Sequence, residues 1–241
     1  MNKTISLAIF ILYSIGVFAQ FAIVNDKNGY VIVRSSPKIE RNNVIDTLYN
    51  GDFVYAFFGT KHHTGWIEIG FKYDNYGYIS ANGIKDIFDY QNIRYLSTED
   101  DKQIFSNDTI LIEIKRKEFD PSKHRIEYKK KTVRLIDGEH FYGTTGKLPK
   151  HEYEYISITQ NGSTYFLPNE AIKNLYDPDS NYSSPNWGNV LVALSFYDKE
   201  NDILYIQSMI GNDVAAYAVI WKVEKGFYKE RAIFPPLCYK C

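Results

Sequence analysis

The chain has 241 residues, with 28 Lys and Arg against 29 Asp and Glu. This near-equal number of basic and acidic side chains gives little long-range attraction for a polyanion or an anionic membrane surface, because such binding depends on clustered basic side chains. Nucleic acid is therefore excluded as an expected partner. The 21 Tyr and 15 Phe against only 2 Met favour strands, since aromatic side chains fit a pleated, half-buried surface. We expect a mainly β protein.

The N-terminus has the pattern of an export signal. Lys3 precedes an apolar run over residues 5–18, which is shorter than the roughly 20 residues that span a membrane. Small side chains at Val17 and Ala19 suit a signal peptidase, so we expect a signal peptide over residues 1–19, cleaved after Ala19. A membrane anchor is the alternative. Cleavage leaves 28 − 1 = 27 basic against 29 acidic residues, a net charge of −2. The mature protein is then periplasmic or secreted, with no stable membrane insertion.

Residues 20–86 contain turn signals and apolar runs at short intervals. Pro37 ends the first run after Ser36, because Pro holds its predecessor in an extended conformation, and Asn50-Gly51 is a strong reversal signal. The predicted strands are residues 30–34, 44–48, 53–58, 66–69 and 76–79. Five short strands in so compact a segment predict a small β-barrel.

This ordered set resembles the bacterial SH3-like family, often called SH3b. The likeness is carried, in chain order, by Ile32-Val33-Arg34-Ser35-Ser36-Pro37, Gly51-Asp52, Gly65-Trp66 and Gly77-Tyr78-Ile79. Two positions depart from the family pattern, since Ile32 stands where Asn is usual and Ser36 where Gly is usual. The resemblance implies a non-catalytic module that engages a peptide, a cell-wall fragment or another exported protein.

Period-two alternation divides residues 53–58 into two faces. If Val54 and Ala56 point inward, the aromatic residues of this strand lie on the opposite face. A small barrel can bind an extended peptide on an aromatic-lined groove. The predicted groove residues are Tyr55, Phe57, Tyr73 and Tyr76. The alternative is that these aromatic side chains cover the linker or the second domain.

Residues 87–108 show no sustained periodicity and contain the acidic run Glu99-Asp100-Asp101, so we expect a linker there. Residues 109–237 predict a C-terminal α+β domain dominated by antiparallel sheet. Its clearest features are a hairpin that turns at Asn161-Gly162 and a short helix that begins near Asn169.

Two stretches of this domain, residues 136–149 and 211–231, resemble an uncharacterised family of exported bacterial proteins. Members tend to have Asp in a Gly-Thr-Asp-Gly stretch where this chain has Thr145. The resemblance implies no known activity.

Cys238 and Cys241 end the chain as a Cys-x-x-Cys pair at residues 238–241. A redox site needs a helix N-terminus to lower one thiol pKa, and a zinc site needs further ligands such as a second Cys pair. Pro235 and Pro236 precede the pair, and no other Cys is present. In an oxidising compartment we expect a small terminal disulfide, or a frayed dithiol tail.

None of the five histidines, His62, His63, His124, His140 and His151, has a spacing that would place two imidazoles on one metal. The remaining acid–base candidates are the pairs Glu139-His140 and His151-Glu152, with surface hydrogen bonding as the alternative. We therefore expect no catalytic residues, no metal and no cofactor.

The predicted function is that of an exported, non-catalytic binding protein whose SH3-like module engages a peptide, a cell-wall fragment or a protein partner. One alternative is an inhibitor or immunity-type protein against another exported enzyme, which would show an exposed apolar patch. The other is a cell-wall hydrolase, which needs carboxylates or imidazoles that converge in a pocket.

Overall fold

The computed structural model describes residues 18–58, 65–178, 181–184, 188–191, 193–210 and 216–234. The predicted signal peptide before residue 18, the pair His62 and His63, and the two cysteines lie outside these residues. The chain is mainly β and its sheets are antiparallel, as predicted. Among the described residues, no helix is long and apolar enough to cross a membrane.

The N-terminal sheet has seven strands in the order β3-β2-β6-β5-β4-β1-β7. Their bounds are β1 Phe18–Val24, β2 Tyr30–Arg34, β3 Val44–Tyr49, β4 Phe53–Phe58, β5 Trp66–Phe71, β6 Asn75–Ser80 and β7 Ile84–Asp86. Short 3-10 turns occur at Arg41–Asn43, Ala81–Gly83 and Ile87–Asp89. All five predicted strands form, and β1 and β7 extend the sheet at one edge.

The turn after β2 is held by its own buried polar side chains. Arg34 Nη1 donates to the carbonyl of Glu40 at 2.6 Å and to Oδ1 of Asn43 at 2.8 Å. Asn43 Nδ2 in turn donates to the hydroxyl of Ser36 at 2.9 Å and to the carbonyl of Lys38 at 3.0 Å. Ser36, unusual for the resembled family, therefore contributes an acceptor that stabilises this turn.

The second sheet has nine strands in the order β14-β13-β10-β9-β8-β17-β18-β19-β20. Their bounds are β8 Gln91–Glu99, β9 Lys102–Ser106, β10 Ile110–Glu118, β13 His151–Gln160, β14 Ser163–Phe166, β17 Ala193–Asp198, β18 Ile203–Ile210, β19 Tyr217–Glu224 and β20 Phe227–Phe234. Two small hairpins, β11 Ile126–Lys129 with β12 Thr132–Ile136 and β15 Asn181–Ser184 with β16 Gly188–Leu191, lie outside it. The helix α1 is Asn169–Ile172, and a 3-10 turn spans Pro121–Lys123.

The predicted linker is replaced by the hairpin β8–β9 of the second sheet. A register shift between Tyr95 and Ser97 interrupts the alternation that would have marked the strand. The acidic run is its turn, where Asp100 and Asp101 have positive φ of 47° and 62°. Asp is among the residues that tolerate this left-handed conformation. Residues 87–108 therefore connect the two sheets without an unstructured linker.

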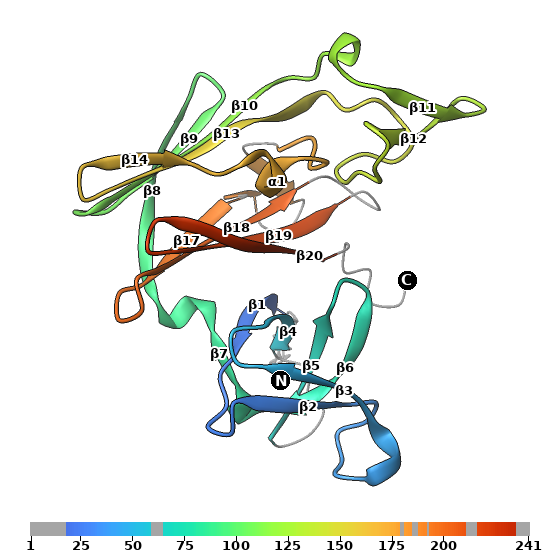
Figure 1. The fold of residues 1–241 in the computed structure, drawn as a ribbon, viewed down its shortest axis with the longest axis vertical. Helices are drawn as coiled ribbons and strands as arrows, with labels where there is room; N and C mark the ends of the chain where they lie inside the picture. The colour runs from blue at the N-terminus through green and yellow to red at the C-terminus, as the bar shows by residue number, and fades with distance from the viewer. Residues whose placement is uncertain are drawn as a thin grey trace, which may run out of the picture.

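The strands form three stacked layers (Figure 1). The first third of β8 pairs with β17 and the rest pairs with β9, so the nine-stranded sheet folds over on itself. A core that includes Ile112, Ile156 and Trp221 fills the space between its two halves. The half formed by β17–β20 is the middle layer, since a second core joins its other face to β1 and β4.

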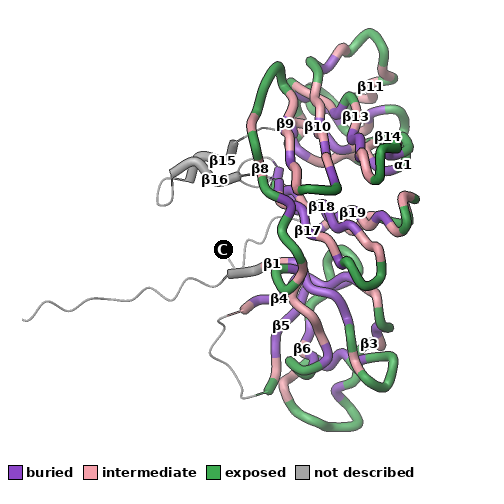
Figure 2. The backbone as a smooth tube through the Cα atoms, turned by 90° about the vertical axis from the view of Figure 1, so that its left-hand side faces the viewer, coloured by how far each residue is buried: buried purple, intermediate pink, exposed green. Residues whose placement is uncertain are grey.

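Strand β19 shows how one sheet serves both cores. Tyr217, Val219 and Trp221 belong to the core of the C-terminal sheet, whereas Ala218 and Ile220 belong to the core shared with the N-terminal sheet. Figure 2 shows buried stretches both in the middle layer and in the strands of the N-terminal sheet. The N- and C-terminal regions therefore share a core.

Candidate functional site

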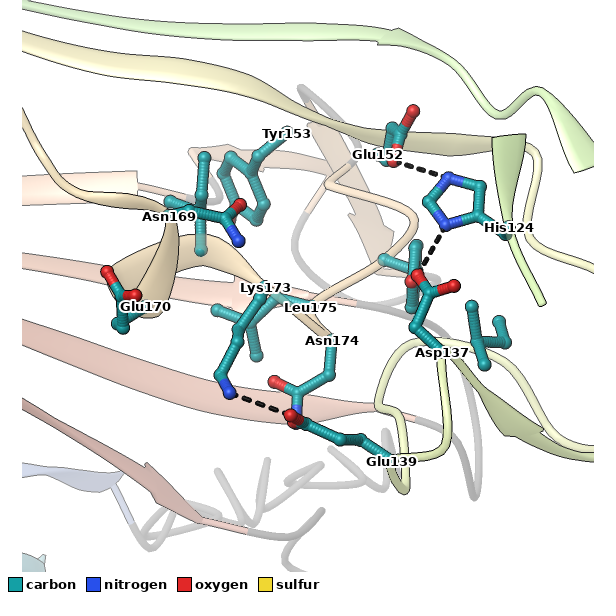
Figure 3. A pocket seen from close by; sticks show the side chains of 13 residues that line it. His124, Asp137, Glu139, Glu152, Tyr153, Asn169, Glu170, Lys173, Asn174 and Leu175 are labelled. Atoms are coloured by element: carbon teal, nitrogen blue, oxygen red, sulfur yellow. Dashed lines mark hydrogen bonds and ion pairs between the residues drawn. The ribbon is translucent and has the colours of Figure 1, made fainter. Parts of the chain in front are cut away.

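A cleft of about 430 Å³ lies beside α1, between β13 and the turn that follows β12 (Figure 3). We call it the α1 cleft. Its titratable side chains are His124, Asp137, Glu139, Glu152, Tyr153, Glu170, Lys173 and Tyr176. Four carboxylates therefore face one Lys and one imidazole.

His124 stands between two of these carboxylates (Figure 3). Its Nδ1 lies 2.7 Å from Oδ2 of Asp137, and its Nε2 lies 3.2 Å from Oε2 of Glu152. The imidazole stacks on Phe119, with ring centroids 4.6 Å apart and planes inclined by 17°. His124 thus joins the turn after β12 to β13, and its ring is held in one orientation.

The carboxyl of Asp137 is stabilised in its charged form. Burial raises its pKa, but hydrogen bonds from His124 and from the backbone N–H of Arg125 outweigh this, so the pKa lies below its ordinary value. Asp137 adopts a φ of 55° and begins the Asp-Gly turn after β12, which is typical turn chemistry. The turn conformation therefore places the carboxylate against the imidazole.

The opposite side of the α1 cleft is fixed by Glu139. It pairs with Lys173 Nζ at 2.7 Å and accepts from Asn174 Nδ2 at 3.3 Å. Glu170 differs, because its exposed carboxylate makes no hydrogen bond or ion pair within the described residues. It is the carboxylate of the cleft that needs no rearrangement to accept a ligand.

The helix behind the cleft is short, and side chains from the middle layer hold it in place. Trp221 Nε1 donates to the carbonyl of Ala171 at 2.6 Å, and Arg231 Nη1 donates to the same oxygen at 2.9 Å. Arg231 Nη1 also reaches the carbonyl of Lys173 at 3.0 Å. These bonds satisfy carbonyls at the end of α1 and fix the wall that carries Glu170.

The electrostatic character of the α1 cleft is negative. The pKa of Tyr176 is raised, first by burial and then by the nearby carboxylates of Asp137, Glu152 and Glu139. Such a field stabilises a bound cation. Acid–base chemistry at His124 is hindered, because both of its ring nitrogens already contact carboxylate oxygens. No three His, Cys, Asp or Glu side chains of the described ranges are arranged to hold a metal ion.

The predicted acid–base pairs are rearranged. Glu139 and Glu152 do enter one cleft, but their partners are Lys173 for the first and His124 with Lys117 for the second, not the adjacent histidines. The sequence patterns did not point to His124, because its two carboxylates come from different elements. The one local signal was Asp120-Pro121 upstream, where Asp120 caps the 3-10 turn Pro121–Lys123 that directly precedes His124.

The predicted aromatic groove is not formed by its four residues. Tyr55 and Phe57 are each only 2% exposed and lie in the shared core, where Tyr55 stacks on Phe234 with centroids 5.7 Å apart. The alternative interpretation, that these side chains cover the second domain, describes their position correctly. Tyr73 and Tyr76 are 47% and 42% exposed and remain available at the surface.

Comparison of the chain with models of protein families, with curated proteins and with solved structures gives no match. The chemistry of the site is therefore inferred from its own geometry.

Proposed function

We propose that this protein is an exported, non-catalytic binding protein that engages a peptide or cell-wall fragment by holding a cationic group of the ligand in the α1 cleft. The observation that carries the proposal is the excess of carboxylates in this cleft over its one Lys and one imidazole. A primary amine placed near Glu170 meets an unpaired carboxylate in a negative field. Export is supported by the Lys3, apolar run and Ala19 pattern.

We also propose that the N-terminal sheet is an SH3-like barrel. The ordered motifs from Arg34 to Ile79 support this, together with the five predicted strands and the internally bonded turn after β2. In this proposal the barrel docks on the middle layer through β1 and β4. Its remaining surfaces engage the ligand or partner.

The proposal is tested by isothermal titration of the full chain with N-acetyl-L-Ala-γ-D-Glu-L-Lys, whose only amine is that of Lys, and with the same peptide acetylated at the Lys amine as well. We expect the peptide without an amine to bind at least about tenfold more weakly, because a charge-assisted hydrogen bond is worth about 1.5–3 kcal/mol. Glu170→Gln weakens binding of the amine form about fivefold, and Glu170→Lys abolishes it. Glu127→Gln, outside the cleft, leaves it unchanged.

Equal affinity for the two peptides would contradict the proposal. Mass spectrometry of the titrated mixture separates binding from turnover. An intact peptide supports a binding protein, whereas a cleaved product would replace the proposal with a hydrolase that uses Glu152 or Asp137.

The second candidate function is an inhibitor or immunity-type protein, and exposed apolar side chains at a sheet edge favour it. Tyr30 lies directly opposite Tyr49 in the β2–β3 ladder, and β3 is an edge strand of its sheet. The exposed apolar residues of these two strands are Tyr30, Ile32, Val44, Ile45 and Tyr49. Capture of an exported enzyme by the full chain, lost in Ile45→Asp but retained in the Phe166→Asp control on β14, would support this function. Equal capture by both variants would exclude this edge.

A further inference from the structure

A second cleft, of about 450 Å³, lies where the N-terminal sheet meets the middle layer. We call it the seam cleft. Its lining includes Lys72 and Tyr73 from the β5–β6 turn, Tyr142 from the segment after β12, and Arg231 from β20. Phe53 and Phe234, both in the shared core, also line it.

Arg231 is the unusual group of this cleft. Nη1 uses both of its hydrogens on the carbonyls of Ala171 and Lys173, and Nη2 donates one hydrogen to Oδ1 of Asn174 at 2.8 Å. A guanidinium has five N–H donors. The Nε–H and the second Nη2–H make no hydrogen bond within the described part of the chain, and no carboxylate there lies within ion-pair distance of Arg231.

The lack of a counter-ion is costly at this position. Burial lowers the pKa of Arg231 from its ordinary value, yet a guanidinium stays charged in proteins. A partly buried charge with neither an ion-pair partner nor a full set of hydrogen bonds is unfavourable. The two remaining N–H groups suit an anionic oxygen pair, because a guanidinium binds a carboxylate through two parallel hydrogen bonds.

The other charged side chains of the seam cleft already have partners. Lys72 pairs with Asp46 at 2.7 Å, and Glu230 lies 3.7 Å from Lys222. The carboxylate of Asp52 accepts from the backbone N–H of Tyr49 at 2.8 Å. Among the basic groups that line this cleft, Arg231 is therefore the one without an ion-pair partner in the described residues, and it is the group that can take an anionic ligand.

An aromatic wall stands beside this cation. The rings of Tyr73 and Tyr142 meet edge to face with centroids 6.0 Å apart. Tyr73 has a φ of 75° and its neighbour Lys72 a φ of 44°. Side chains larger than Asn rarely adopt this left-handed conformation, because Cβ crowds the backbone. The turn accepts this strain and holds the Tyr73 ring against Tyr142 at the cleft.

We infer that the seam cleft binds a carboxylate-bearing ligand with a flat group next to the carboxylate, such as the C-terminal end of a peptide with an aromatic residue. Arg231 holds the carboxylate through its two unused N–H groups, and Tyr73 with Tyr142 packs against the flat group. The inference does not rest on the proposed cation binding in the α1 cleft.

The test uses N-acetyl-L-phenylalanine as the probe and N-acetyl-L-phenylalaninamide as its uncharged match, titrated into the full chain by calorimetry. We expect the acid to bind at least about tenfold more tightly than the amide. Arg231→Lys keeps the charge but loses the two-pronged geometry, and we expect it to weaken binding of the acid at least about fivefold. Arg125→Gln, an exposed Arg outside the cleft, serves as the control.

Arg231 also supports α1, so a second variant separates ligand binding from folding. Tyr73→Ala leaves the hydrogen bonds of Arg231 to α1 in place, and we expect it to weaken binding of the acid about fivefold or more without changing the melting temperature. Equal binding of acid and amide would overturn the inference. An affinity for the acid that is unchanged in both Arg231→Lys and Tyr73→Ala would overturn it as well.

Discussion

The α1 cleft and the seam cleft are linked by Arg231, which lines the seam cleft and donates to the carbonyls of Ala171 and Lys173, yet the unpaired charges of the two clefts have opposite signs. In the α1 cleft carboxylates are in excess, and three of them contact His124 or Lys173, which leaves Glu170. In the seam cleft Arg231 lacks a counter-ion within the described residues. A net charge of −1 for the whole chain therefore conceals two local sites of opposite sign.

The two clefts also differ in what lies beneath them. The seam cleft rests on the shared core, in which aromatic residues of β4 pack against β20. The α1 cleft is held by polar contacts between loops and strands, His124 being the central one. We therefore expect substitutions below the seam cleft to affect stability most, and substitutions in the α1 cleft to affect it less.

The largest expected effect is that of removing a shared-core ring. Phe57→Ala should lower the free energy of unfolding by about 3–5 kcal/mol, the usual cost of a large-to-small change of a buried aromatic residue. Urea denaturation followed by circular dichroism measures it. Tyr49→Ala, at a position 63% exposed, is the matched control and should stay within about 0.5 kcal/mol of the parent. If the two variants are equally stable, the regions do not share a core.

Alkaline pH tests the same core without removing a ring. Burial raises the pKa of Tyr55 to about 12. Its contribution to stability is therefore complete below the unfolded pKa of about 10 and is lost as the pH rises towards 12. A shift of about two units corresponds to about 2–3 kcal/mol.

Tyr55→Phe keeps the ring and removes the titrating hydroxyl. Between pH 10 and 12, Tyr55→Phe should therefore lose about 2–3 kcal/mol less of its free energy of unfolding than the parent. Urea midpoints across this pH range measure the difference. Tyr49→Phe should leave the pH profile unchanged. A Tyr55→Phe profile identical to that of the parent would place Tyr55 in contact with solvent.

A smaller effect is expected in the α1 cleft. His124→Gln removes the imidazole that joins Asp137 to Glu152, and we expect a loss of about 1–2 kcal/mol at neutral pH. A double-mutant cycle with Asp137→Asn measures the coupling between the two side chains. Strictly additive losses would show that the short contact in this structure stabilises nothing.

The smallest effect is expected in acid. The pKa of Asp137 is lowered in the folded protein, so its contribution is present above the unfolded pKa of about 3.9 and is lost as the pH falls further. Asp137→Asn should remove part of the loss of stability below pH 4, by less than about 1 kcal/mol because the carboxyl is largely exposed. Asp108→Asn, outside the cleft, is the control and should lose as much stability below pH 4 as the parent does.

Much of the fold was predictable from local patterns, because strand alternation and turn residues act over a few positions. The five strands from Tyr30 to Ser80 follow from such signals. The prediction of a linker over residues 87–108 was wrong, because these residues include β8 and β9. The strands were hidden in the sequence because a bulge at Tyr95 breaks the alternation of β8, and because the acidic β8–β9 turn resembles a charged linker.

The sites were harder to predict, because they depend on contacts between distant segments. Period-two alternation predicted that Tyr55 and Phe57 share one face of their strand. That face is buried because β20, which is distant in the sequence, packs against it. His124, Asp137 and Glu152 come from three elements, and no spacing in the sequence relates them. Of the four predicted groove residues, Tyr73 lines the seam cleft. Its position there depends on a positive φ of 75°, which the sequence does not predict for Tyr.

The most direct test of the proposed function is to locate a bound cationic group on the protein. Backbone amide shifts of the ¹⁵N-labelled full chain are recorded during titration with N-acetyl-L-Ala-γ-D-Glu-L-Lys. We expect the largest shifts at Glu170 and its neighbours in residues 169–176, with smaller shifts at His124. Shifts that instead cluster on β2 and β3, or that persist equally when the Lys amine is also acetylated, would contradict the proposal.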